Sequence, residues 1–252
     1  MKRHSLIKLS NAHNKKHHIE FMFVPRKKAC QAALTAASRR KHSAPSRELP
    51  TSSQSNMKAY AFGLVPNDTN PQSKDLLNPF GGKVLAQQST RNALYKENID
   101  TFRSAFVYEF PSLPDAIRWR QAQVENRESK EEEAKQTENG LMVIEESEDL
   151  NQTFTGYSVF FINILDKISF AKYDPTQSLE KYKHKRIATP IAKAAGASRS
   201  AHSFDAAVLI AFDTPDHGKT WLESQEYRPH GELRMRTTSG HGIVIGRTRK
   251  LD

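Results

Sequence analysis

The chain has 252 residues, with 38 Lys and Arg against 28 Asp and Glu, so its formal net charge is +10. No apolar stretch approaches the roughly 18 residues that a membrane-spanning helix needs, and we therefore expect no membrane contact. The single cysteine, Cys30, excludes an intrachain disulfide framework and a cysteine-based zinc site.

The excess of positive charge lies at the start of the chain. Residues 1–56 contain twelve Lys and Arg against two Glu, whereas residues 57–252 contain 26 basic and 26 acidic side chains. The first segment has little hydrophobic periodicity and cannot bury enough apolar surface to offset the entropy of ordering. We predict a disordered basic tail over 1–56, and we expect the neutral remainder not to bind nucleic acid.

Several roles for this tail stay open. Arg26–Lys28 and Arg39–Lys41 have the spacing of a two-part nuclear-import signal, and the acid-poor stretch 26–47 resembles an organellar transit peptide. Loose, salt-sensitive association with nucleic acid is a third alternative. Met57 stands directly before the first strand-like run, as an alternative start would, so the tail is equally interpreted as dispensable. The default location is cytoplasmic, with targeting by the tail as the alternative.

The neutral part opens with strand and turn signals. Ala59–Val65 predicts a strand, a short helix follows near 73–77, and Gly81-Gly82 marks a turn before the strand residues Lys83–Ala86.

A strand and a helix of this first set follow. Phe106–Phe110 predicts the strand, and Ser112 with Asp115 forms a capping pair at the start of the helix. We interpret the charge run at 128–138 as a solvated helix extension and loop. Gly140–Ile144 then predicts a strand.

A similar set of elements follows an acidic, polar linker predicted over 145–155. Tyr157–Leu165 predicts a strand, and a helix is expected from Gln177 to Ala195, between Pro175 and Gly196. The remaining predicted elements are a short strand at Arg199–Ser203, a strand at Ala206–Phe212, a helix capped by Thr214 and running to about Tyr227, and a closing strand at Gly242–Gly246.

The two sets form an internal repeat. An offset of 102 places Phe110 on Phe212 and Trp119 on Trp221, the two tryptophans of the chain. The order strand, helix, strand, strand, helix, strand is that of the ferredoxin-like split βαβ module. Because one such module leaves one sheet face uncovered, we predict an α+β fold in which two modules, 57–148 and 149–252, pack sheet to sheet as an intrachain pseudo-dimeric barrel.

The second set carries a familiar pattern. Phe212, Trp221, the Ser224-x-x-Tyr227 step and Arg234, followed by Gly242–Gly246, resemble the domain-of-unknown-function 1330 family of dimeric α+β barrels. The resemblance covers roughly 157–246 and, more faintly, 59–145. In the first set, the positions of Ser224, Tyr227 and Arg234 are taken by Ala122, Glu125 and Glu132, so it resembles a degenerate partner.

This pattern supplies the candidate site. Ser224, Tyr227 and Arg234 are the predicted catalytic residues, where Arg would hold a carboxylate or enolate and Tyr would donate a proton. The predicted ligand-binding residues are Trp221, Phe212 and His241. The alternative is that Tyr227 and Arg234 only pack the helix end and its loop. The barrel seam is expected to be lined by Phe160, Ile162, Val208 and Ile210.

Other chemistries find no support in the sequence. The histidines His184, His202, His217, His230 and His241 show no metal-ligand spacing, and no glycine-rich phosphate loop or nucleophile elbow is present, so we expect no metal and no cofactor. We predict that a small, partly hydrophobic molecule is bound or transformed in the barrel of the second module. A non-enzymatic structural or ligand-binding barrel is the alternative, and both enzymatic activity and further self-association are left open.

Overall fold

The computed structural model describes residues 57–66, 74–128, 140–150 and 153–247, all within one compact unit. The predicted tail, 1–56, and nearly all of the charge run at 128–138 lie outside the described residues. In the described part of the chain, no helix is long and apolar enough to cross a membrane.

One antiparallel sheet, sheet A, contains the strands predicted in the first set. The strands expected at 59–65, 83–86, 106–110 and 140–144 are all confirmed. The linker predicted from residue 145 starts later, because the last of these strands continues through residue 148. In order across the sheet, the strands are β2 (Lys83–Ser89), β4 (Ser104–Phe110), β1 (Met57–Val65), β5 (Leu141–Glu148) and β8 (Gly196–Ala197).

The other antiparallel sheet, sheet B, contains the strands of the second set. The strand expected at 157–165 is confirmed with slightly different bounds, and those at 206–212 and 242–246 are confirmed. In order across the sheet, the strands are β3 (Tyr95–Glu97), β10 (Thr238–Gly246), β6 (Gly156–Ile164), β9 (Ala206–Phe212) and β7 (His184–Pro190).

Each sheet receives one short edge strand from the other half of the chain. β3 follows β2 of sheet A in the chain but pairs with β10, where Glu97 lies opposite Gly242. β8 follows β7 of sheet B but pairs with β5, where Gly196 lies opposite Ile144. The exchange is reciprocal, so neither sheet is complete without a segment of the other half.

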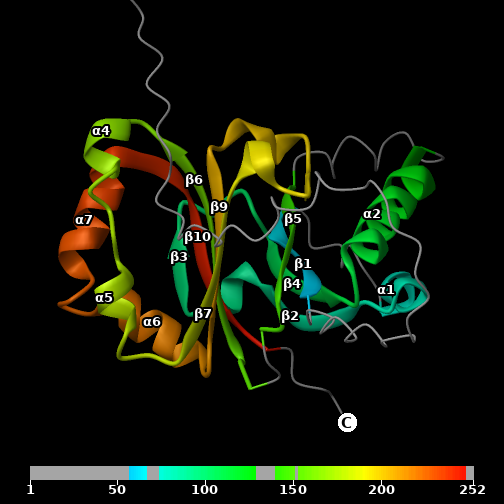
Figure 1. The fold of residues 1–252 in the computed structure, drawn as a ribbon, viewed down its shortest axis with the longest axis horizontal. Helices are drawn as coiled ribbons and strands as arrows, with labels where there is room; N and C mark the ends of the chain where they lie inside the picture. The colour runs from blue at the N-terminus through cyan, green and yellow to red at the C-terminus, as the bar shows by residue number, and fades with distance from the viewer. Residues whose placement is uncertain (1–56, 67–73, 129–139, 151–152, 248–252) are drawn as a thin grey trace, which may run out of the picture. The chain divides into compact units, whose positions relative to one another are not determined.

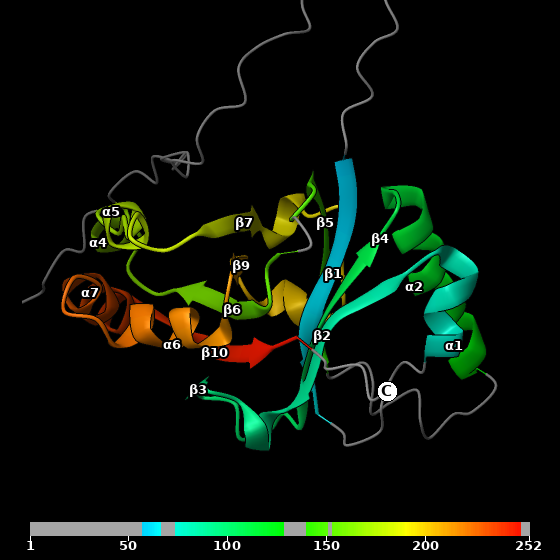
Figure 2. The same cartoon turned by 90° about the horizontal axis from the view of Figure 1, so that it is seen from below.

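Helices cover the outer face of each sheet (Figures 1 and 2). Ser112 accepts a hydrogen bond from the Asp115 amide at 3.4 Å, as the capping prediction requires, and Thr214 caps its helix by accepting from the His217 amide at 3.2 Å. Over sheet A lie α1 (Lys74–Leu77), the 3₁₀ turn η1 (Asn78–Phe80) and α2 (Leu113–Glu128); over sheet B lie α4 (Lys167–Phe170), α5 (Thr176–Leu179), α6 (Pro215–Glu223) and α7 (Arg228–Thr237).

The predicted helix over 177–195 is wrong. The chain leaves α5 at Leu179 and forms β7, which pairs with β9 over its full length. A proline inside a helix removes a hydrogen bond and clashes with the preceding turn, so Pro190 already argued against a continuous helix. The strand expected at 199–203 is also wrong, because residues 200–203 form a 3₁₀ turn, η4 (Ser200–Ser203), beside the short strand β8.

A shared apolar core fills the space between the two sheets. Phe62 of β1 and Phe161 of β6 belong to it, with ring centroids 6.5 Å apart. Two antiparallel sheets that face each other across such a core, with helices outside, are consistent with an α+β barrel. A second core, which includes Trp119, lies between α2 and sheet A.

The expected lining of the barrel seam needs correction. Val159, Phe161 and Leu209 point into the core between the sheets. Because successive side chains of a strand alternate between faces, their neighbours Phe160, Ile162, Val208 and Ile210 face the helices instead. Both faces of β6 and β9 are buried, and therefore the sequence offers no polar alternation that would distinguish them.

Candidate functional site

The predicted helix ending near Tyr227 is interrupted, and the break positions the candidate residues. α6 ends at Glu223, where the Ser224 amide donates to the Trp221 carbonyl at 3.1 Å. The Ser224 hydroxyl accepts from the Tyr227 amide at 3.1 Å, and α7 begins with Arg228 and Pro229. Proline suits a first helical turn because its missing N–H is not needed there. Arg234 therefore lies in a helix of its own, and Ser224 shapes the turn before it.

Arg234 is buried, with a residue exposure of 5%, and all three of its guanidinium nitrogens are bonded. Nη1 donates to Glu97 Oε1 at 2.8 Å and Nη2 to Glu97 Oε2 at 2.6 Å. Nε donates to the Tyr227 hydroxyl at 3.1 Å, and the guanidinium lies 5.3 Å from the Phe160 ring centre. This two-pronged pairing fixes the guanidinium plane. The carboxylate comes from β3, the strand contributed by the first half of the chain.

Tyrosine hydroxyls extend the ion pair at both ends. Tyr95, on the same strand as Glu97, donates to Glu97 Oε2 at 2.9 Å. At the other end, the Tyr227 hydroxyl lies 3.3 Å from the Tyr173 hydroxyl. Tyr173, Tyr227, Arg234, Glu97 and Tyr95 thus form one continuous hydrogen-bonded chain, which we call the tyrosine–arginine cluster. It lies between sheet B and its helices.

Burial and the ion pair shift the pKa values in this cluster. Burial raises the pKa of Glu97, but the hydrogen bonds and charge of Arg234 outweigh it, so the net pKa is lowered. Burial lowers the pKa of Arg234, but the opposite effect of Glu97 and the nearby tyrosines is larger. The net pKa of Arg234 is therefore above its usual value. Burial, chiefly, raises the pKa of Tyr95 and of Tyr173. At neutral pH the ion pair is charged and both tyrosines are protonated.

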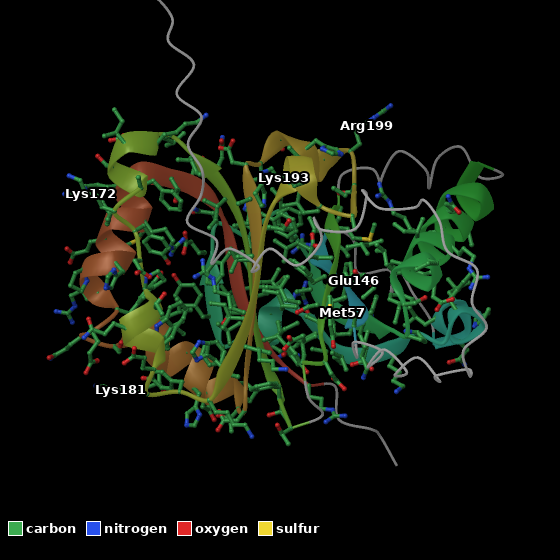
Figure 3. All side chains as sticks on the ribbon, in the orientation of Figure 1. Met57, Glu146, Lys172, Lys181, Lys193 and Arg199 are labelled. Atoms are coloured by element: carbon green, nitrogen blue, oxygen red, sulfur yellow. The ribbon has the colours of Figure 1, made fainter. Side chains whose placement is uncertain are left out.

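Aromatic side chains adjoin the cluster. The Trp221 ring centre lies 4.4 Å from that of Tyr227 and 5.9 Å from that of Phe212. The Trp221 indole N–H donates to the buried Ser178 hydroxyl at 2.9 Å. The structure therefore brings Trp221, Phe212, Tyr227 and Arg234 together. Lys172, just after α4, and Lys181, just after α5, are labelled in Figure 3 on the side of the molecule where helices cover sheet B.

His241 is placed apart from these residues. It lies between Gly240 and Gly242 on β10, and its ring packs edge-on against Phe102 at 5.0 Å and Phe204 at 5.5 Å. Its Nδ1 is bonded to the carbonyl oxygen of Asn98. The predicted pairing of His241 with Trp221 and Phe212 in one ligand-binding set has no direct contact to support it.

Sequence reasoning missed three of the five cluster residues. Tyr95 and Glu97 lie in the first half of the chain, and only the exchange of β3 brings them to Arg234. Tyr173 lies between α4, which the sequence did not predict, and α5, which coincides with the start of the helix predicted from Gln177. The spacing Tyr95-x-Glu97 places both side chains on one strand face, and this was the signal available.

The described residues contain no cluster of metal-ligating side chains: no group of three or more His, Cys, Asp or Glu within the described ranges could hold a metal ion. Every histidine there is at least partly exposed, and those at 184, 217 and 241 each use Nδ1 in a hydrogen bond, which fixes the orientation of the ring.

Comparison with known proteins gives limited help. No protein-family model matches the chain, and no curated protein matches it, so the resemblance to the domain-of-unknown-function 1330 family stays a prediction. Solved structures with a similar outline include a mutant chlorite dismutase from Candidatus Nitrospira defluvii in complex with cyanide (12% identity, TM-score 0.43, 78% of this chain and 92% of that chain). Others are an anthrone oxidase-like protein (6%, 0.43, 78% and 93%) and a heme-binding protein from Thermus thermophilus (10%, 0.40, 77% and 91%). Scores this low support no conclusion about function.

Proposed function

We propose that the chain is a tandem duplication of two ferredoxin-like modules, 57–148 and 149–252, with the first copy degenerate. Across sheet A the strands run β2-β4-β1-β5, and across sheet B β7-β9-β6-β10, which is the same order when each half is counted separately. In each half, the short strand that comes after the second long strand pairs with the last strand of the other half: β3 pairs with β10, and β8 pairs with β5. These correspondences support a pseudo-dimer within one chain.

We further propose that the second module binds or transforms a small, partly hydrophobic molecule at the tyrosine–arginine cluster. The observation that carries this is the buried Arg234–Glu97 pair, extended by tyrosine hydroxyls and walled by Trp221. A buried ion pair adds little net stability compared with apolar side chains of similar size. Its presence among aromatic residues with shifted pKa values is typical of a functional site.

The chemistry of the cluster favours a ligand with a weakly acidic oxygen, such as a phenol or an enol. Arg234 would stabilise negative charge on that oxygen, and the hydroxyl of Tyr227, which accepts from Arg234, would donate a hydrogen bond to it. Because burial raises the pKa of Tyr173, its hydroxyl would act as a hydrogen-bond donor rather than as a base. Trp221 and Phe160 would contact the hydrophobic part of the ligand.

A structural role is the second candidate, and one observation favours it. All three guanidinium nitrogens of Arg234 are already bonded, so the pair can serve to fasten β3 to α7. A ligand would then have to share or displace Glu97.

Ligand binding separates the two candidates. We would record the thermal unfolding midpoint of the full chain with increasing naphthol, a neutral phenol with an apolar body. Binding at the cluster predicts a saturable rise that Tyr227→Phe reduces at least about tenfold in affinity, since the donated hydrogen bond is lost. Tyr182→Phe is the matched control, because Tyr182 packs against Phe212 outside the cluster. If Tyr227→Phe and Tyr182→Phe respond alike, the structural role is the better account.

A further inference from the structure

The sheet-facing side of α2 carries buried hydrogen-bond donors that have no acceptor. Trp119 has 0% exposure and its indole N–H is unpartnered, and Gln123 has 8% exposure and its amide nitrogen is unpartnered. Buried polar groups in proteins are nearly always bonded, so each of these needs an explanation. Neither group has a partner in the part of the chain that the structure describes.

A positive charge accompanies these donors. Arg120 is partly buried, and no carboxylate pairs with it among the residues whose side chains the structure describes. Its Nη1 lies over Gly196 of β8, 3.2 Å from where a Cβ would stand, beside Ile117 and Ile144. Burial lowers the pKa of this guanidinium, but arginine stays protonated at neutral pH.

Helical spacing makes Gln123 a neighbour of both Trp119 and Arg120. Gln123 follows Trp119 by four positions and Arg120 by three, and residues so spaced contact one another along a helix. Ala116, on the same side, is buried in the core over sheet A. The side therefore combines neutral donors and one positive charge.

Over sheet B, the tryptophan at the equivalent position and the buried arginine of α7 are both satisfied. The Trp221 indole N–H donates to Ser178, and the buried arginine over sheet B, Arg234, is paired with Glu97. Over sheet A the indole N–H of the equivalent tryptophan, Trp119, has no acceptor among the described residues, and burial lowers the pKa of Arg120. A ligand that satisfies them must supply acceptor oxygens and negative charge, which are the properties of an oxyanion.

We propose that Arg120 and Gln123 of α2 bind the oxyanion group of a small molecule, a carboxylate or a phosphate, with Trp119 at the buried end of the site. The anion would reach the site from solvent at Arg120, because this residue is partly exposed. A bound water could satisfy Gln123 but could not balance the charge of Arg120. The site is separate from the tyrosine–arginine cluster and does not depend on it.

The test uses the full chain, with acetate and inorganic phosphate as separate probes at constant ionic strength, balanced with chloride. We expect one or both anions to raise the unfolding midpoint saturably; acetate alone identifies a carboxylate site, and phosphate alone a phosphate site. Arg120→Met is expected to weaken this binding at least about tenfold, because the charge-assisted hydrogen bonds are lost. Gln123→Met is expected to weaken it less and, without anion, to unfold at a slightly higher temperature than the wild type.

Arg118→Met provides the matched control on the same helix. Arg118 is exposed and pairs with Asp115, so its replacement should leave anion binding unchanged. The proposal is overturned if neither anion shifts the midpoint beyond chloride, if Arg118→Met and Arg120→Met lose binding equally, or if both α2 variants, Arg120→Met and Gln123→Met, bind as the wild type does.

Discussion

The two tryptophans of the chain stand at equivalent positions of the proposed repeat, yet their surroundings differ. Trp119 and Trp221 are both buried, and each packs on the last aromatic residue of a strand, Phe110 or Phe212. The apolar contacts are therefore shared, whereas the polar partners are not. The Trp221 indole N–H meets Ser178, while that of Trp119 meets no acceptor among the described residues. The two halves thus share this aromatic packing and differ at the polar groups around it.

The largest effect is expected at the ion pair of sheet B. Arg234→Ala leaves the partly buried carboxylate of Glu97 without its cation, and Glu97→Ala leaves the buried guanidinium of Arg234 without its anion. Each should lower the free energy of unfolding by about 3–5 kcal/mol, as for other broken buried pairs. Chemical denaturation measures this; a loss below about 1 kcal/mol for both would show that the pair is effectively solvated.

The two tryptophans allow a matched comparison. Trp119→Phe and Trp221→Phe remove the same ring volume, but only Trp221→Phe also removes a hydrogen bond, the one to Ser178. The second variant should therefore be less stable than the first by about 1 kcal/mol. Equal losses in denaturant titrations would mean that the indole of Trp119 also has a partner.

Acid should weaken sheet B through Glu97. Its pKa in the folded protein lies below the ordinary value of 4.5, so its contribution to stability is present above about pH 4.5 and is lost as the pH falls through the folded pKa. The stability difference between the wild type and Glu97→Gln should therefore be constant near neutrality and shrink at lower pH. A difference that does not vary with pH would contradict the assigned pairing.

The smallest effect on stability is expected from deleting residues 1–56, which carry the net charge of +10. The unfolding midpoint should not change if the tail is disordered, as its composition predicts. Any nucleic-acid binding should disappear with the tail and should fall steeply as salt is added to the full chain. Nucleic-acid binding that survives the deletion would show that the binding surface lies within residues 57–252.

The sequence was sufficient for the four long strands of sheet A, for β6, β9 and β10 of sheet B and for part of the site, but not for β7 or for the short strands β3 and β8. The aromatic-ended strand, Trp221, Tyr227 and Arg234 were recognised from one local pattern, and the structure places them together. Glu97 was not found, because a three-residue strand has no periodicity and its partner lies 137 residues away. The faces of β6 were assigned wrongly since both are apolar. Local patterns indicate elements, while long-range pairing decides which residues meet.

The central claim is that a carboxylate from the first half completes the site of the second half. A double-mutant cycle with Glu97→Gln, Arg234→Met and the combined variant tests it most directly, using free energies of unfolding from denaturant titration. The account predicts a coupling energy of about 2–3 kcal/mol, since the double variant removes both charges and leaves neither unpaired. Additive losses, with a coupling energy within about 0.5 kcal/mol of zero, would show that β3 does not bring Glu97 to Arg234.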